Sequence, residues 1–452
     1  MTARLRTALV TAALAAAPVA AGPPDVLTGP GTASLTLTAP LADLRRLASR
    51  EDDASVQGSL TLDDGSHGTP YTVRVSERGH TSRNPGECAF PKLRLEFVSA
   101  DRTGGPFDSV DVLKIGTHCG DAAPDTLTPK YGRLANELAP RREAMVYSLL
   151  AAAGVPTLLA RPARITYAGT GASAQPPLTR YALLLEDDDA AAARLGATEM
   201  LTEDTFDSAA HRFSPLDTAR LALAEAMVGN FDWCLRMFPG DIYRCDDRHP
   251  LWNILGLSGI GSRALPLPYD FDLSGPVVGR HVWFDQVFDR TFVDPPSAVR
   301  VEVLAQVQRT RTLFTRAVLD EARASFVSAR TAIEAAITNA DVDERGRDLA
   351  RQYVGAFFEA ITDDTRFYQP VLVEGGHVAW LDPDGQTFAC GADSSTVPEG
   401  TPVAPLGPER NGRSQVRLLD ALWKWTGNNR CDTVHRQPIW IDSRALGTEY
   451  PR

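Results

Sequence analysis

The chain lacks the motifs that define several large enzyme classes. It has no GxxxxGK(S/T) phosphate loop, no GxGxxG after a predicted strand, no HExxH and no GxSxG. These absences disfavour a P-loop enzyme, a zinc protease and an α/β-hydrolase. No internal repeat is evident either, which disfavours a solenoid or a propeller.

Basic residues are in the minority, with 46 lysines and arginines against 57 aspartates and glutamates and a formal net charge of −11. No basic stripe is present that could neutralise a nucleic-acid backbone, so we expect no nucleic-acid partner. Nucleotide binding needs only a local basic cluster and stays open. The length of 452 residues and the 43% hydrophobic content are typical of a globular protein of two or three domains.

Long apolar runs are absent after the N-terminus, so no membrane span is expected. Residues 1–21 combine two arginines, a short Ala/Leu/Val run and small residues around Ala20 and Ala21. This pattern predicts a secretory signal peptide cleaved near Ala21, and therefore a secreted or periplasmic protein. Residues 22–33, rich in Gly, Pro and Thr, are expected to form a linker.

Cysteine is scarce, at six residues, and no CxxC pair occurs. An even number of cysteines in an exported protein favours disulfides over a zinc site. The cysteines lie in three local pairs along the chain. We therefore expect the bridges Cys88–Cys119, Cys234–Cys245 and Cys390–Cys431, although six cysteines allow other pairings.

Apolar periodicity predicts an α+β chain. Strand patterns dominate residues 34–97, and Leu93, Leu95 and Phe97 alternate strictly with polar residues. Helices are predicted over residues 131–156, 214–229, 297–340 and 343–361, and a strand hairpin over residues 251–272. This order indicates a two-lobed α+β domain rather than a regular βαβ fold.

The C-terminal part of the chain differs from the rest. Short strand patterns broken by Gly and Pro turns resemble a small SH3-like β-barrel, a module that usually binds peptides or cell-wall material. We therefore expect one domain over residues 34–365 and a small β-rich domain over residues 369–452.

Carboxylates and one amide are spaced through the second half of the first domain. Asp232 follows the 214–229 helix, Asn253 lies on the hairpin, and Asp270 and Asp272 end it. Carboxylate and amide oxygens suit Mg²⁺ or Mn²⁺, with a nucleotide supplying the remaining ligands. Protein-kinase-like enzymes use this order, in which the first Asp orients or deprotonates the acceptor. The plainer alternative is a solvated turn in which Asp270 and Asp272 cap backbone amides.

A cluster of cations precedes these acids. Because Leu93 and Leu95 share one face of their strand, Lys92 points to the opposite face and can project into a cleft. Arg78 and Arg83 stand shortly before it. The three cations suit an anion-binding corner. The alternatives are that they form structural salt bridges or face solvent.

Together the segments RGHTSR (78–83), PKLRLEF (91–97), GNFDW (229–233) and PYDFDLSG (268–275) resemble the spore-coat protein H (CotH) kinase family over about residues 34–361. The resemblance implies a protein-kinase-like fold and ATP-dependent phosphorylation of Ser or Thr on an exported protein, with Mg²⁺ or Mn²⁺. It implies Asp232 as the catalytic residue, Asn253, Asp270 and Asp272 as metal ligands, and Arg78, Arg83, Lys92, Glu143 and Glu186 as cofactor-binding residues.

One departure from the family pattern bears on activity. Trp252 stands before Asn253, where family members often have a histidine. The main alternative is therefore an inactive kinase-like scaffold that serves as a cell-envelope or surface interaction protein. Another nucleotidyl transfer on the same fold and a metal-dependent hydrolase are further alternatives, because a fold does not fix a reaction.

Overall fold

The computed structural model describes residues 25–63, 68, 70–98, 105–122, 125–171, 174–236, 249–279, 295–311, 314–368, 371–372, 377–389, 396–397, 403–418 and 438–447. The expected signal peptide and the cysteines Cys245, Cys390 and Cys431 lie outside the described residues. In the described part of the chain, no helix has the length and apolar character needed to cross a membrane.

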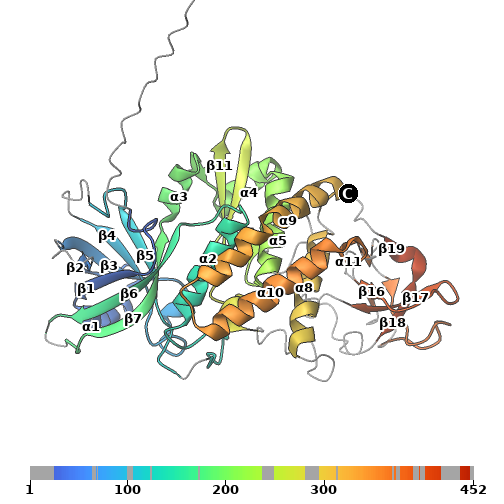
Figure 1. The fold of residues 1–452 in the computed structure, drawn as a ribbon, viewed down its shortest axis with the longest axis horizontal. Coiled ribbons are helices and arrows are strands. Elements are labelled where there is room, and N and C mark those ends of the chain that lie inside the picture. The colour runs from blue at the N-terminus through green and yellow to red at the C-terminus, as the bar shows by residue number, and fades with distance from the viewer. Residues whose placement is uncertain are drawn as a thin grey trace, which may run out of the picture.

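Seven strands close into a barrel at one end of the molecule, coloured blue to green in Figure 1. Their order is β1-β2-β3-β4-β5-β7-β6, and every neighbouring pair is antiparallel except the parallel pair β1 and β6. The elements are β1 (Ala33–Ala39), α1 (Leu41–Ala48), β2 (Ser55–Leu62), β3 (Tyr71–Arg78), β4 (Lys92–Phe97), β5 (Val112–Gly116), β6 (Ala160–Gly169) and β7 (Leu178–Glu186).

The barrel core forms from alternate residues of each strand. Leu93 and Leu95 of β4 are buried inside the barrel, as their alternation predicts. Val26 and Leu27, which belong to the expected linker, are buried in the same core. The polar residues of β4 consequently face away from the barrel, and this orientation positions the site described below.

Helices and a hairpin form the middle of the molecule (Figure 1). The helices are α2 (Ala139–Ala152), α3 (Asp188–Arg194), α4 (Glu203–Ala209), α5 (Pro215–Met227), α6 (Gly275–Val278), α8 (Pro295–Arg311), α9 (Arg316–Asn339), α10 (Glu344–Thr362) and α11 (Asp364–Phe367). Strands β11 (Ile254–Ile260) and β12 (Arg263–Pro268) form the predicted hairpin, extended by β8 (Glu199–Met200). A second strand pair joins β9 (Cys234–Leu235) to β10 (Leu251–Trp252).

Helix α5 begins where the sequence predicts. Ser214 is the N-cap, its hydroxyl accepts a hydrogen bond from the Asp217 amide at 3.3 Å, and Pro215 occupies the first turn. The helix ends at Met227, and Gly229 then takes a left-handed φ of 57°. A Cβ at Gly229 would lie 2.2 Å from the ring of Tyr353, so glycine is required there.

The single helix predicted over residues 297–340 is wrong, because the structure has two helices, α8 and α9, in this region. Thr315 is the N-cap of α9 and has extended backbone angles, φ −66° and ψ 154°. The apolar stripe runs past the break because both helices pack on one core, which contains Val303, Val307 and Phe326. Periodicity alone therefore could not show the interruption.

The helix predicted over residues 131–156 begins only at Ala139, one residue before Pro140. Arg142, which is 1% exposed, then anchors α2 to the rest of the helical region. Its guanidinium donates to Asp343, the N-cap of α10, at 3.0 and 2.7 Å, to Asp125 at 2.8 Å and to the Val277 carbonyl at 3.0 Å. This network fixes the helix that carries Glu143.

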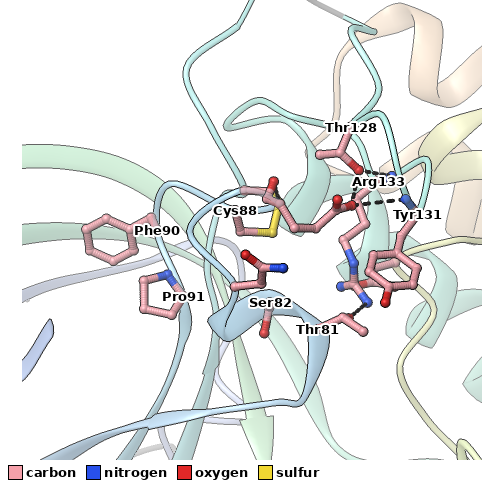
Figure 2. Close-up of a disulfide and its surroundings, with 12 residues drawn as sticks. Thr81, Ser82, Cys88, Phe90, Pro91, Thr128, Tyr131 and Arg133 are labelled. Carbon is pink, nitrogen blue, oxygen red and sulfur yellow. Dashed lines mark hydrogen bonds and ion pairs between the residues drawn. A yellow bond between two sulfur atoms is a disulfide. The ribbon is translucent and has the colours of Figure 1, made fainter. Parts of the chain in front are cut away.

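The disulfide Cys88–Cys119 is confirmed. It joins the loop before β4 to the segment after β5, and Figure 2 shows Cys88 close to the turn that carries Thr81 and Ser82. Cys234 is also disulfide-bonded, to a partner outside the described residues. The loop that leads into Lys92 is thus covalently tied to the neighbouring strand connection.

At the far end of the molecule lie the short strands β13 (Val371–Leu372), β14 (His377–Val378), β15 (Thr396–Val397), β16 (Val403–Pro405), β17 (Arg413–Leu418), β18 (Ile439–Asp442) and β19 (Leu446–Gly447) (Figure 1). They pair in two- and three-stranded sheets over a small apolar core. The described residues do not connect these sheets into a closed barrel, so an SH3-like domain stays a prediction.

Candidate active site

Four cations lie near one another on the outer face of the barrel sheet. In the strand register, Arg78 of β3 lies opposite Lys92 of β4, and Arg94 of β4 lies opposite Lys114 of β5. The residues between them along each strand face the barrel core, so these four side chains share the outer face. The strands thereby bring together positive charges that lie up to 36 positions apart in sequence, from Arg78 to Lys114.

A cavity of about 420 Å³ lies against this face. Its polar lining comes from Arg78, Arg94 and Lys114 of the sheet and from Asp187, Asp188, Asp189 and Asp270. Leu158, Leu185, Met200, Tyr147 and Tyr269 supply apolar surface. The cavity therefore combines cations and carboxylates with a surface on which a flat apolar group can lie.

Lys114 is ion-paired with two of the aspartates that line the cavity. Its ammonium group lies 2.6 Å from Asp188 and 3.5 Å from Asp187. Asp187 also caps α3, because its side chain accepts a hydrogen bond from the Asp189 amide at 3.3 Å. The acidic run after β7 thus starts a helix, and it also contributes charge to the cavity.

Asp232 lies in the turn after α5 and is 8% exposed. Its carboxylate accepts hydrogen bonds from the indole nitrogen of Trp252 at 3.0 Å and from the amide nitrogen of Asn253 at 3.2 Å. The Asn253 amide also donates to the Asp232 carbonyl at 2.5 Å. The hydrogen bonds from Trp252 and Asn253 hold the carboxylate in one orientation.

Asn253 and Asp270 lie side by side at one end of the β11–β12 hairpin, where Asn253 accepts a backbone hydrogen bond from Tyr269 at 3.1 Å. Both have left-handed backbone conformations, with φ values of 53° and 61°. Asn and Asp tolerate this region better than other residues with a side chain. The Asp270 amide donates to the Tyr147 hydroxyl of α2 at 3.1 Å, which ties the turn to that helix.

Lys92 bridges the two carboxylates of this turn. Its ammonium group is ion-paired with Asp270 and donates to Asp272 at 3.0 Å. Burial opposes the charge on Lys92, yet attraction to Asp270 and Asp272 raises its pKa above the usual value. Burial acts against ionisation of Asp270 too, but Lys92 and Arg133 lower the pKa of Asp270 to about 2. The carboxylate of Asp270 is therefore charged at neutral pH.

Arg133 is a further cation at this turn. It is ion-paired with Asp272 and donates to the Thr81 hydroxyl at 2.6 Å, and Figure 2 shows its guanidinium beside Thr81. Arg133 is 7% exposed. It thereby links the turn that carries Asp270 and Asp272, the acidic turn, to the loop before β4.

Glu143 of α2 is buried close to Lys92. Burial raises the pKa of Glu143 to about 8, although the positive charge of Lys92 acts in the opposite direction. Lys92 is ion-paired with Asp270 and Asp272. Glu143 is buried beside these ion pairs.

Arg83 and Glu186 have partners outside this group. Arg83 is paired with the exposed Asp52 at 3.3 Å. Glu186 ends β7 and accepts two hydrogen bonds from Arg194, each at 2.8 Å, and one from the Leu159 amide at 3.0 Å. The structure therefore gathers Arg78, Lys92, Glu143, Asp232, Asn253, Asp270 and Asp272 around one region, and gives Arg83 and Glu186 other partners.

The acidic turn fits a divalent ion in one respect that the structure shows directly. Oδ1 of Asp272 is buried and has no hydrogen-bond partner among the described residues. Such an atom is a natural ligand for a cation. In the described part of the chain, no three Asp, Glu, His or Cys side chains gather closely enough to hold a metal alone. The turn thus suits Mg²⁺ or Mn²⁺ held jointly with oxygens of a ligand.

Sequence reasoning missed Lys114, Arg133 and Tyr147 as residues of this site. Lys114 could have been found from the strand pattern around it, since it alternates with Leu113 and Ile115 as Lys92 does with its apolar neighbours. Arg133 and Tyr147 carry no such signal. Their roles depend on the tertiary contacts of a loop and of α2.

Comparisons with known proteins are sparse. No protein-family model matches the chain, and no curated protein matches it. Among solved structures, the Helicobacter pylori proinflammatory kinase CtkA shows 9% sequence identity and a TM-score of 0.30, over 61% of this chain and 92% of that chain. Because this TM-score is low, the function proposed below rests on the geometry of the site.

Proposed function

We propose that the chain is an ATP-dependent, protein-kinase-like phosphotransferase that uses Mg²⁺ or Mn²⁺ and acts on Ser or Thr of an exported protein. One observation carries the proposal: cations from the outer face of the sheet line one cavity together with Asp270 and with apolar side chains. A nucleoside triphosphate would present its phosphate oxygens to the cations, and its metal ion would lie at Asp270. The apolar surface of the cavity suits the base.

The cations would bind the phosphates. Arg78 makes no ion pair among the described residues, and its Nε is buried without a hydrogen-bond partner there. Arg78 is therefore available for an anionic ligand, with Arg94 and Lys92 beside it on the same face. Planar guanidinium groups match phosphate geometry, whereas a lysine acts as a point charge.

Asn253, Asp270 and Asp272 would hold the metal ion. When bound, a divalent ion neutralises charge on the transferred phosphoryl group. The left-handed turns at Asn253 and Asp270 place both side chains at the same end of the hairpin before any ligand arrives. Such preorganisation lowers the entropy cost of binding.

Asp232 would orient the acceptor hydroxyl and accept its proton. Hydrogen bonds from Trp252 and Asn253 hold its carboxylate in place. Trp252, at 39% exposed, also presents an indole face to solvent beside this carboxylate. The acceptor of the phosphoryl group would thus approach from the Trp252 side.

A catalytically inactive scaffold is the second candidate, and a specific observation favours it. Lys92 and Arg133 both contact Oδ2 of Asp272, and Lys92 also contacts Asp270. Positive charges at these oxygens compete with a metal ion. Nucleotidyl transfer, which would use the same phosphate and metal contacts, is a variant of the first candidate.

The direct test is transfer of labelled γ-phosphate from ATP, with Mg²⁺ or Mn²⁺, to the protein itself and to proteins exported by the same cell. Asp232→Asn keeps the size of the side chain but replaces one carboxylate oxygen with an NH2 group, so it removes the proton acceptor and one of the two side-chain hydrogen bonds from Trp252 and Asn253. We expect transfer by the native protein and at least about 100-fold less by the variant, the usual size of an acid–base contribution. Equal labelling by both proteins, or labelling from α-phosphate instead, would contradict the assigned reaction.

A further inference from the structure

We infer that Glu225 and Asn230 are positioning residues that fix Asp232 from inside the helical core. The inference rests on the proposed function, in which Asp232 orients the acceptor. Neither residue belongs to the cavity wall, and both are 0% exposed. Any contribution to the reaction would therefore be indirect, through the position of Asp232.

A chain of hydrogen bonds connects these residues. The side-chain amide of Asn230 donates to Oε2 of Glu225 at 2.9 Å, and its oxygen accepts from the backbone amide of Asp232 at 3.1 Å. The backbone amide of Asn230 also donates to the Glu225 carbonyl at 3.0 Å. Asn230 is thus held at two points by Glu225, and it holds the backbone of Asp232 in turn.

The placement of Glu225 has a cost that core packing does not explain. Its neighbours on α5, Leu221, Ala222, Ala224 and Ala226, are all apolar and buried. Burial raises the pKa of Glu225 to about 8, so the carboxyl group is protonated at neutral pH. An apolar side chain would fill this position without that cost. What the carboxyl group adds is the acceptor for Asn230.

The turn after α5, which carries Asn230, also contacts the segment that follows Asp272. The Gly275 amide, three residues after Asp272, donates to the Val228 carbonyl at 2.9 Å. Tyr353 packs against both Gly229 and Gly275, whose added Cβ atoms would each lie 2.2 Å from its ring. The turn that carries Asn230 therefore meets the segment that follows the acidic turn. A shift at Asn230 would displace Asp232 relative to Asn253 and Asp270.

Two substitutions at one position separate this role from plain core packing. Glu225→Met keeps the length and volume but removes the acceptor, whereas Glu225→Gln keeps an oxygen that can accept from Asn230. The first readout is hydrogen exchange of the Asp232 amide, which needs no catalytic activity. We expect faster exchange by about tenfold in Glu225→Met, the equivalent of one lost hydrogen bond, and near-native exchange in Glu225→Gln.

The second readout is phosphoryl transfer. Misplacing a catalytic group by about 1 Å costs on the order of 100-fold in rate, so kcat should fall in Glu225→Met with KM for ATP unchanged. Glu225→Gln should restore kcat. Leu37→Ala, a cavity in the barrel core and therefore outside the core that contains α5, serves as a control that lowers the melting temperature and leaves both readouts at native values.

The possible outcomes distinguish failure of this inference from failure of the proposed function. Native exchange at Asp232 and native kcat in Glu225→Met, or failure of Glu225→Gln to restore them, would overturn the inference. If Glu225→Met does not fold, Asn230→Ala tests the same hydrogen-bond chain at its middle residue. If the native protein transfers no phosphoryl group, the proposed function fails, and the exchange measurement still decides whether Glu225 and Asn230 fix Asp232.

Discussion

Asn253 and Asp270 share one unusual backbone conformation at the same end of the β11–β12 hairpin, with φ values of 53° and 61°. Each residue points an oxygen-bearing side chain toward the cluster formed by Lys92, Asp232 and Asp272. Left-handed backbone at non-glycine residues is concentrated at functional sites, where the surrounding structure holds it in place. Here the hairpin and the hydrogen bond from the Asp270 amide to Tyr147 hold it.

Glycine should therefore be better tolerated than alanine at both positions. We expect Asp270→Gly to be about 0.5–1 kcal/mol more stable than Asp270→Ala, because alanine strains a left-handed backbone and glycine does not. The same order is expected for Asn253. Chemical denaturation checks the prediction. At Ala324, an exposed residue in the middle of α9, the order must reverse, because alanine stabilises a helix interior more than glycine does. Greater stability of Asp270→Ala than of Asp270→Gly would contradict the prediction.

Removing the bridge between Cys88 and Cys119 should lower the free energy of unfolding. The two cysteines are 31 positions apart, so the double variant Cys88→Ala, Cys119→Ala should lose about 3.7 kcal/mol through the entropy of the unfolded chain. Urea denaturation of the oxidised protein and of the variant measures the loss. Reductant is not an equivalent treatment, because Cys234 is also disulfide-bonded. Unchanged stability would contradict the prediction.

Stability should fall as the pH is lowered from about 6.5 to 4, in part through His118. Burial lowers the pKa of His118 from 6.5 to about 4, so between these values the unfolded chain binds a proton that the folded chain does not. The ring is 2% exposed and stacks on Phe90 at 4.9 Å between centroids, with Asp121 and Arg180 nearby. His118→Phe keeps the stacking and should reduce the acid loss by up to about 3 kcal/mol. If the free energy of unfolding fell equally with pH in both proteins, the prediction would be wrong.

Arg133→Met should strengthen binding of Mn²⁺ in the absence of nucleotide. Arg133 is ion-paired with Asp272, a proposed metal ligand, so its charge opposes the metal ion. Even at the dielectric constant of water, a unit charge about 5 Å from a divalent ion repels it by roughly 1.7 kcal/mol, so removing the charge should raise the affinity by about tenfold or more. Titration calorimetry measures the affinity. Arg141→Met, which removes an arginine paired with Asp341, is the control, and equal affinities of the two variants would contradict the prediction.

Local patterns predicted the parts of this structure that local physics determines. Alternation around Leu93 placed Lys92 on the outer face of its strand, and Ser214 with Pro215 marked the start of α5. The hairpin that brings Asn253 beside Asp270 followed from two apolar runs and a Gly/Ser turn. These signals lie within a few residues of the features they determine.

Features that depend on distant contacts were not predictable. Arg133 meets Asp272 across 139 positions, and nothing in its own segment points to that partner. The break between α8 and α9 was hidden because both helices bury apolar residues in one core. Glu186 and Arg83 were matched to a family pattern, but their observed partners, Arg194 and Asp52, are set by the local packing of this chain.

The central claim is that the cavity between the cationic sheet face and the acidic turn binds ATP with a divalent ion. A melting scan with ATP, with Mg²⁺ or Mn²⁺, and with both tests it most directly. Asp270→Asn preserves the left-handed turn while removing the charge, and Asp348→Asn on the exposed side of α10 is the matched control. The account predicts that ATP with metal raises the melting temperature, because binding at a hundredfold excess over Kd adds about 2.7 kcal/mol to the free energy of unfolding. The rise should be retained in Asp348→Asn and lost in Asp270→Asn. No shift in the folded native protein, or an equal shift in Asp270→Asn, would contradict it.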